Sequence, residues 1–350
     1  MSCDLLHRLG WVPVALVSLG WFASAGAQEH TIIALSHTDF TAYELDPATG
    51  RIVNRFTAEN QPHEAVVSPD GGTIFVTVPR DPPYVTILDA AGFEEIGRIE
   101  SEHFHRPPEE GEPGTEPNTS ALPHGIALNR DGTKLYIGVE GAEVPGMVVY
   151  DVGRGAVSRK IDLLLEGGHY LALDPGTDKL YYPHRDDDRV VVIDTRTDEI
   201  VKIIEVPGGP VGVAFTPGGE AWVHSDYDGT VTAIDTSTDE VVARLDTGGQ
   251  GAGRIAVSPD GRFAASTRNE TGNVVLIDIE KREVAGQVAL GPGPGFPLFA
   301  PDSRTLYVMV RGEGEVAVVE LDGDGDGHLA ARHPAGETPF GGTLRYLGGR

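Results

Sequence analysis

A single phrase recurs along the chain at a nearly constant spacing, and each copy precedes a hydrophobic run that ends in Asp. The clearest copy is Val67–Val76, which reads VSPDGGTIFV. Later copies begin at residues 128, 173, 215, 257 and 299, and the last four are 42 residues apart. A period of about 40–50 residues that contains several short strands is typical of a β-propeller. The sequence therefore predicts an all-β fold built from repeated blades.

The repeat also changes what the length implies. A chain of 350 residues would ordinarily suggest two or three domains. Blades in a ring form one closed unit, because each blade buries its faces against its neighbours. The 46 Gly and 25 Pro residues suit a chain with frequent tight turns. We therefore expect one propeller domain over residues 28–350.

Residues 1–27 have the pattern of a signal peptide. Arg8 lies near the start, an apolar stretch covers residues 11–22, and Ala25-Gly26-Ala27 offers a small-residue cleavage site. The alternative is an uncleaved anchor, but the stretch is short for a membrane span and contains Pro13. We expect a periplasmic or extracellular protein that has no membrane span once the leader is removed.

Composition limits the chemistry and the partners. Cys3 is the only cysteine and would leave with the leader, so we expect neither a disulfide nor thiolate chemistry in the mature chain. The net charge of −26 disfavours binding to nucleic acid. We expect a monomer whose partner is a small molecule or another protein.

Each repeat divides into four predicted strands, A to D from the channel outward. In the second blade these are residues 63–68, 73–78, 84–89 and 95–99, where β-branched and aromatic residues alternate and turn residues intervene. Six strands C end on Asp, whose carboxylate is expected to accept hydrogen bonds from the turn backbone: Asp46, Asp89, Asp151, Asp194, Asp235 and Asp278.

The two ends of the chain complete one blade. The first strands, residues 31–36, 41–46 and 51–57, match B, C and D and lack an A. The last segment, residues 339–347, matches an A with no B after it. Pairing the ends closes a seven-bladed ring of four-stranded blades and leaves no long exposed strand edge.

These motifs resemble those of a known family. The Ser-Pro-Asp-Gly turn, followed by strands such as Lys134–Ile137 and Arg304–Val308 and by the run Val192–Thr197, is similar to YVTN-type β-propellers. The resemblance covers nearly all of the chain after the leader and extends to the cytochrome d1-like and lactonase-like superfamily. It implies a seven-bladed propeller, but such propellers include haem-bearing, copper-bearing, lactone-hydrolysing and purely binding proteins. The fold therefore does not determine the function.

Histidines recur where the topology brings strands together. Strands A and B are antiparallel, so the start of A and the end of B reach the same face, at the mouth of the central channel. His63, His124 and His169 stand at the start of strand A in three consecutive blades. Three more lie near the end of strand B in blades one, four and five: His37, His184 and His224. We expect all six at the channel mouth.

Converging imidazoles predict a metal site. Without cysteine, such a site favours copper, zinc or iron, and catalysis would need an open coordination position. The resemblance includes copper enzymes with histidine ligands around the mouth. The chain differs from nitrous oxide reductase, because it lacks an appended copper domain with Cys and Met ligands. The alternative is that these histidines are scaffold residues that were duplicated with the blades.

A long insertion, residues 101–121, joins blade two to blade three on the same face. It is either a lid, with His103 and His105 available to a ligand, or a disordered surface excursion. Four arginines could also reach this face and bind a carboxylate or phosphate, unless they are ordinary surface residues: Arg80, Arg185, Arg254 and Arg268.

Asp322, Asp324 and Asp326 alternate with glycines as in the first half of a calcium loop. The twelfth position is His333, so the bidentate Glu of an EF-hand is missing. The segment is either a calcium site or an acidic turn between strands C and D. No motif for c-type haem, a nucleophile elbow or a Walker loop is present.

We interpret the chain as a secreted propeller that binds a small ligand or metal ion at a histidine-lined mouth, as a binding or interaction protein. The first alternative is a metalloenzyme acting on a small substrate. A lactonase-like hydrolase is the third, because no catalytic motif accompanies that resemblance. The sequence leaves open whether the protein is an enzyme.

Overall fold

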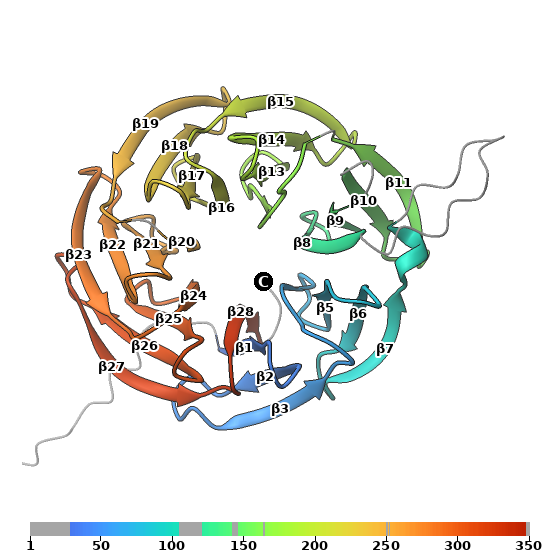
Figure 1. The fold of residues 1–350 in the computed structure, drawn as a ribbon, viewed down its shortest axis with the longest axis horizontal. Helices are drawn as coiled ribbons and strands as arrows, with labels where there is room; N and C mark the ends of the chain where they lie inside the picture. Colours follow the sequence, from blue (N-terminus) through green and yellow to red (C-terminus); the bar gives the residue numbers. More distant parts are fainter. Residues whose placement is uncertain are drawn as a thin grey trace, which may run out of the picture.

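The strands form a ring of seven four-stranded antiparallel sheets around a central channel (Figure 1). This computed structural model describes residues 29–104, 121–141, 146–163, 165–249, 251 and 253–347. The predicted seven-bladed β-propeller is therefore confirmed. The predicted leader, residues 1–27, lies outside the described residues, as does most of the predicted insertion.

The innermost strand of each blade is given first. Blades one and two comprise β28 (Pro339–Tyr346), β1 (His30–Ser36), β2 (Thr41–Leu45) and β3 (Ile52–Thr57), then β4 (Ala65–Val67), β5 (Thr73–Val78), β6 (Tyr84–Asp89) and β7 (Glu94–Ile99). Blades three and four comprise β8 (Leu122–Leu128), β9 (Lys134–Glu140), β10 (Gly146–Asp151) and β11 (Ala156–Asp162), then β12 (Ala172–Leu173), β13 (Lys179–His184), β14 (Arg189–Asp194) and β15 (Glu199–Glu205).

Blades five and six comprise β16 (Pro210–Phe215), β17 (Glu220–Ser225), β18 (Thr230–Asp235) and β19 (Glu240–Asp246), then β20 (Ile255–Val257), β21 (Phe263–Arg268), β22 (Asn273–Asp278) and β23 (Glu283–Ala289). Blade seven comprises β24 (Pro294–Phe299), β25 (Thr305–Val310), β26 (Glu315–Leu321) and β27 (Gly327–Pro334). A short 3-10 helix, η1, covers Ser101–His103. In the described part of the chain, no helix is long and apolar enough to cross a bilayer.

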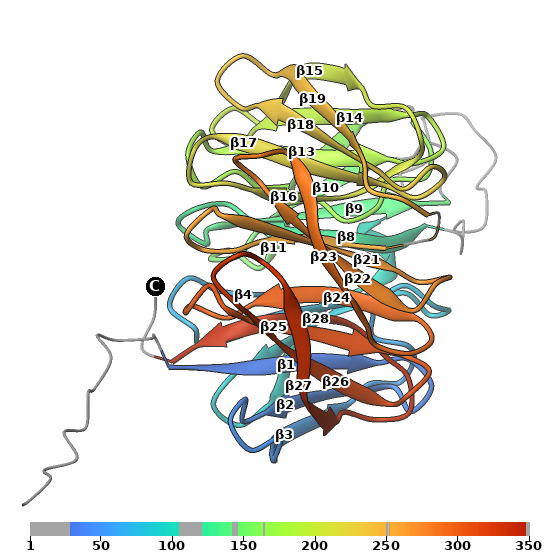
Figure 2. The same ribbon diagram turned by 90° about the vertical axis from the view of Figure 1, so that its left-hand side faces the viewer.

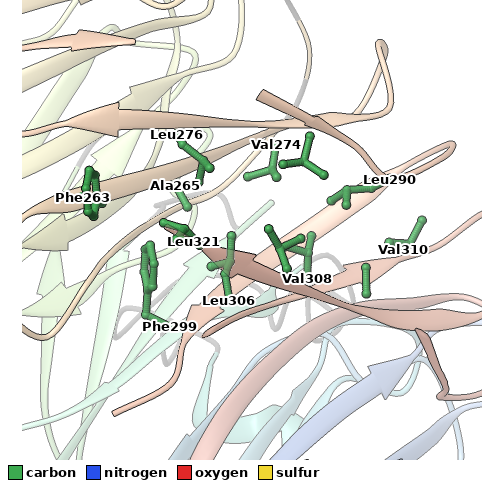
Figure 3. Close-up of a cluster of buried hydrophobic side chains, with 13 residues drawn as sticks. Phe263, Ala265, Val274, Leu276, Leu290, Phe299, Leu306, Val308, Val310 and Leu321 are labelled. Atoms are coloured by element: carbon green, nitrogen blue, oxygen red, sulfur yellow. The ribbon is translucent and has the colours of Figure 1, made fainter. Parts of the chain in front are cut away.

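The middle strands are apolar on both faces because each blade packs between two others. In β14, the run from Val190 to Ile193 is fully buried. The outermost strands, such as β23 and β27, lie along the rim (Figure 2). Most of their residues are exposed or half-buried. Figure 3 shows the core between blades six and seven, where Phe263 and Leu276 meet Phe299 and Leu306. Each such buried side chain stabilises the fold by roughly 1.5–3 kcal/mol.

The ring is closed by the two ends of the chain, as predicted. β28 pairs with β1 from His30 opposite Tyr346 to Leu35 opposite Gly341. In Figure 1 the red β28 and the blue β1 lie side by side. The first and last segments of the described chain therefore share one sheet, and neither leaves an open inner edge.

The Asp residues at the ends of strands C have the structural role predicted for them. Asp194 Oδ1 accepts a hydrogen bond from the backbone N of Arg196 at 2.8 Å. The Arg196 guanidinium also binds this carboxylate and, by hydrogen bonding, lowers the pKa of Asp194 to about 2. Equivalent bonds to the turn backbone form at the other five: Asp46, Asp89, Asp151, Asp235 and Asp278.

Ion pairs, two of them with an added tyrosine hydrogen bond, join neighbouring blades at the face opposite the channel mouth. Lys134 Nζ lies 2.8 Å from Asp198 Oδ2, and Tyr136 donates to the same carboxylate. One blade on, the same three positions are occupied by Lys179, Tyr181 and Asp239. One blade further, the charges are reversed: Glu220 accepts from Arg282 at 2.5 Å. At this position either blade can therefore supply the positive or the negative member of the ion pair.

Candidate functional site

The topology places three histidines in a row at the channel mouth. Each stands five residues before the first residue of the turn between strands A and B: His63, His124 and His169 precede Ser68, Asn129 and Asp174 in this way. The backbone N of His63 donates to Thr77 and that of His169 donates to Pro183, so each is fixed to strand B of its blade. Equivalent positions in adjacent blades bring the side chains together.

The imidazole rings contact one another across blades one to four. The ring centroids of His63 and His124 are 4.4 Å apart, and those of His124 and His169 are 5.0 Å apart. His37 stacks on His63 with centroids 5.1 Å apart and an interplanar angle of 23°. Four of the six predicted histidines therefore form one continuous cluster, which we call the histidine row: His37, His63, His124 and His169.

Two carboxylates complete this cluster. Glu140 Oε1 lies 3.2 Å from His124 Nδ1 and 3.3 Å from His169 Nδ1. The two Nδ1 atoms are themselves 3.3 Å apart. Glu64 Oε1 lies 3.9 Å from His63 Nδ1. In the described residues, two groups of three potential metal ligands result, and both contain His124: His63, Glu64 and His124, and His124, Glu140 and His169.

The sequence analysis missed both carboxylates because it followed only histidine. Glu64 directly follows His63, and Glu140 is the last residue of β9, at the end of a strand B. The same topological argument that selected the histidines would have selected Glu140. The signal was therefore present in the sequence.

Burial leaves most of the row uncharged. Burial and the nearby imidazole of His124 hold the pKa of His169 and of His63 far below the ordinary value. Burial lowers the pKa of His37 to about 3, with Arg311 adding to the effect. Neutral imidazoles keep a lone pair available for a metal ion.

His124 and Glu64 are shifted in the opposite direction. Burial alone would lower the pKa of His124, but hydrogen bonding and charge attraction from Glu140 outweigh it, and the pKa is raised. Burial raises the pKa of Glu64, whose side chain is only 1% exposed. The mouth therefore holds a carboxylate that its surroundings disfavour in the ionised form.

Several polar atoms of this cluster are buried without a hydrogen-bond partner among the described residues. They include His63 Nδ1, both carboxylate oxygens of Glu64 and His169 Nε2. Buried polar atoms in folded proteins are normally paired. The chemistry of these atoms, imidazole nitrogen and carboxylate oxygen, fits coordination of a cation.

His184 and His224 are not brought into either ligand group. His184 is buried edge-on against Tyr182, with ring centroids 4.4 Å apart, and burial lowers its pKa to about 4. His224 Nδ1 lies 3.1 Å from Arg268 Nη1 and 3.0 Å from Ser266 Oγ. Because an arginine only donates, His224 Nδ1 accepts this bond, and the other nitrogen faces Asp226.

The four predicted arginines occupy different environments. Arg80 is exposed and donates to Gln61, whereas Arg185 pairs with Asp186. Arg268 is fully buried beside His224. Arg254 is buried near the histidine row and stacks on two phenylalanine rings. The sequence analysis did not select Arg311, a fifth arginine, which lies over the ring of Phe340.

The remaining candidates lie apart from the row or outside the described residues. His103 ends η1, and its Nδ1 lies 3.2 Å from the carbonyl oxygen of Glu100. His105 is outside the described residues. Asp322 Oδ1 accepts from the backbone N of Asp324 and of Asp326, as in an acidic turn between β26 and β27. Calcium binding there stays a prediction.

Comparison with known proteins supports the fold. No protein-family model and no curated protein matches the chain. A putative 6-phosphogluconolactonase from Bacteroides fragilis matches 92% of this chain and 99% of its own, with a TM-score of 0.73 and 16% identity. The periplasmic gluconolactonase PpgL of Pseudomonas aeruginosa matches 91% and 99%, with a TM-score of 0.71 and 16% identity.

The dihydro-heme d1 dehydrogenase NirN matches 86% of this chain and 63% of its own, with a TM-score of 0.62 and 16% identity. At these identities the similarity concerns the fold, and fold alone does not determine activity. The chain therefore shares the fold of these three matched structures, and this fold is the seven-bladed propeller that the resemblance to YVTN-type propellers implies.

Proposed function

We propose that this protein is a secreted metal-binding propeller that takes a small ligand at the channel mouth. The ligands we assign to the metal are Nδ1 of His124, Nδ1 of His169 and Oε1 of Glu140. The ion is a divalent transition metal, and zinc suits this set of two nitrogens and one oxygen best. The acidic composition, the signal-like leader and the structural similarity to a periplasmic gluconolactonase support a location outside the cytoplasm.

The observation that carries this proposal is the triangle formed by the three ligand atoms. Its edges are 3.2, 3.3 and 3.3 Å. Zinc binds His nitrogen and carboxylate oxygen at about 2.0–2.2 Å, so ligands of a tetrahedral ion are roughly 3.3–3.5 Å apart. The triangle therefore has the dimensions of one face of a zinc tetrahedron. The fourth corner of such a site is free for water or a ligand.

The rest of the row supports the ligands. His63 contacts the ring of His124, and His37 stacks on His63. Glu64 adds a buried negative charge that raises the pKa of His124 together with Glu140. A buried negative charge close to the ligands favours the site with a bound cation over the site without one.

The test is metal analysis of the mature protein purified without a histidine tag. We expect about one transition metal per chain, or one zinc bound after reconstitution, and loss of binding in His124→Ala and in Glu140→Gln. The control is His328→Ala, because His328 is 71% exposed on β27 and lies in neither ligand group. Unchanged zinc affinity in both site variants would refute the proposed site.

A metal-dependent hydrolase is the second candidate. The Glu140 side chain is 23% exposed, unlike the buried Glu64, although its Oε1 atom is itself buried, so Glu140 is the ligand nearest to solvent. A three-ligand site with an open position is also the arrangement of catalytic zinc. Two matched structures are named as lactonases. Zinc-dependent hydrolysis of a sugar lactone that Glu140→Gln abolishes would support this candidate, and equal rates for the apo and zinc forms would exclude it.

A further inference from the structure

Arg254 lies buried beside the histidine row without a carboxylate partner. Its residue exposure is 6%, and its guanidinium lies over the rings of Phe296 and Phe340, 5.1 and 5.7 Å from their centroids. Nη1 donates to the carbonyl oxygen of Gly253 at 3.0 Å. Nε is buried and has no hydrogen-bond partner among the described residues. The edge of the guanidinium that contains Nε therefore remains available.

Arg311 approaches the same aromatic ring from blade seven. Its guanidinium carbon lies 4.2 Å from the centroid of Phe340, and its Nε is also buried without a partner among the described residues. Phe340 in turn contacts His37 and His63, at centroid distances of 5.1 and 5.6 Å. One phenyl ring thus links the two arginines to the histidine row.

Two cations in this position need an anion. Burial and the charge of Arg254 lower the pKa of Arg311, which shows that the two guanidinium groups repel each other. Neither forms an ion pair with a carboxylate within the described part of the chain, and the buried Glu64 attracts Arg254 only from beyond ion-pair distance. Buried arginines are normally paired, because an unpaired buried charge is strongly destabilising. The phenyl faces compensate for only part of this cost.

We infer that Arg254 and Arg311 bind the carboxylate of a small organic acid at the channel mouth. This inference rests on the proposed function in one respect: the same ligand would use the open position of the metal. A carboxylate matches the geometry, because the free edge of Arg254, which contains Nε, can donate two parallel hydrogen bonds to its two oxygens. The phenyl rings of Phe296 and Phe340 exclude water and strengthen those bonds.

The experiment measures binding of glycolate and malate, with glycolamide as the neutral analogue of glycolate and inorganic phosphate as a second anion. Calorimetry or thermal shift is run on both the zinc-loaded and the chelator-treated protein. We expect both carboxylates to bind each form, and glycolamide to bind at least tenfold more weakly. Arg254→Gln and Arg311→Gln should each weaken the carboxylates at least tenfold. Arg304→Gln, an exposed arginine at the opposite face, is the control.

The outcomes separate this inference from the metal proposal. Carboxylate binding to a protein that binds no zinc would support the arginine site and refute the metal site. Binding only to the zinc form, unaffected by either arginine variant, would overturn the arginine site and leave the metal site standing. Equal binding of glycolamide, binding of phosphate alone, or no binding would overturn the inference. If Arg254→Gln does not fold, the less buried Arg311→Gln decides the result.

Discussion

Replacing Glu64 with glutamine should stabilise the metal-free protein and weaken its response to metal. Glu64 is 1% exposed, and neither carboxylate oxygen has a hydrogen-bond partner among the described residues. Its raised pKa shows that burial outweighs the attraction of His124 and Arg254. The ionised form is therefore a net cost in the metal-free fold. Glutamine has nearly the same shape and removes the charge.

The size of both effects follows from the burial and the charge. An unsatisfied buried polar group costs about 1–3 kcal/mol, and a charged one costs more. We expect metal-free Glu64→Gln to exceed the parent protein in free energy of unfolding by about 1–3 kcal/mol. Zinc at 100 times its Kd stabilises the parent by about 2.7 kcal/mol. Losing a supporting carboxylate lowers metal affinity by about 10–100-fold, which removes roughly 1.3–2.3 kcal/mol of that increment at the same zinc concentration.

The assay is chemical denaturation of both proteins at pH 7 with and without saturating zinc. The two curves should cross: the variant is more stable without zinc and gains less from it. Glu44→Gln is an instructive comparison, because Glu44 is equally buried but accepts hydrogen bonds from Thr31 and Asn54 and pairs with Arg345. That variant should be destabilised. A metal-free Glu64→Gln less stable than the parent would refute the reasoning.

Three further predictions concern pH, packing and the contacts between blades. The pKa of His184 falls from 6.5 to about 4 on folding, so the folded state loses stability as the pH falls from 6.5 toward 4; denaturation should show that His184→Gln removes about 2 kcal/mol of the loss at pH 5, while the share due to His37, His63 and His169 remains. Gly125→Ala places a methyl group against the carbonyl oxygen of His169. Calorimetry should show weaker zinc binding, and denaturation should show a loss of about 1–3 kcal/mol in the free energy of unfolding. Lys179→Glu sets two acids together at a contact now 2.7 Å long and should lower the melting temperature, and adding Asp239→Arg should restore it by recreating the reversed pair of the next blade.

The fold could be predicted from the sequence because each repeat carries the same signals for strands and turns. The turn phrase, the Asp after strand C and the incomplete blades at the two ends each specify the same ring. Strands β5 and β6 fall at the predicted residues 73–78 and 84–89. β4 is shorter than predicted, at Ala65–Val67, although the backbone of His63 and of Glu64 still forms hydrogen bonds with Thr77 of β5.

The site was predicted only in part, because side-chain position depends on register as well as on blade topology. His63, His124 and His169 share one register and form a row. His224 lies inside the ladder of β17, opposite Gly212, and is buried against Arg268. Glu140 is the last residue of β9 and reaches the row. A shift of one residue along a strand turns a side chain to the other face, so residue type alone does not identify the ligands.

The most direct test of the central claim is X-ray absorption spectroscopy of the zinc-loaded protein, combined with anomalous diffraction to locate the ion. We predict a four-coordinate zinc with two imidazole nitrogens and one carboxylate oxygen at about 2.0–2.2 Å, located between His124, His169 and Glu140. Glu140→Gln should change the spectrum, and His328→Ala should leave it unaltered. An ion surrounded only by oxygen, or one located at Asp322–Asp326, would contradict the account.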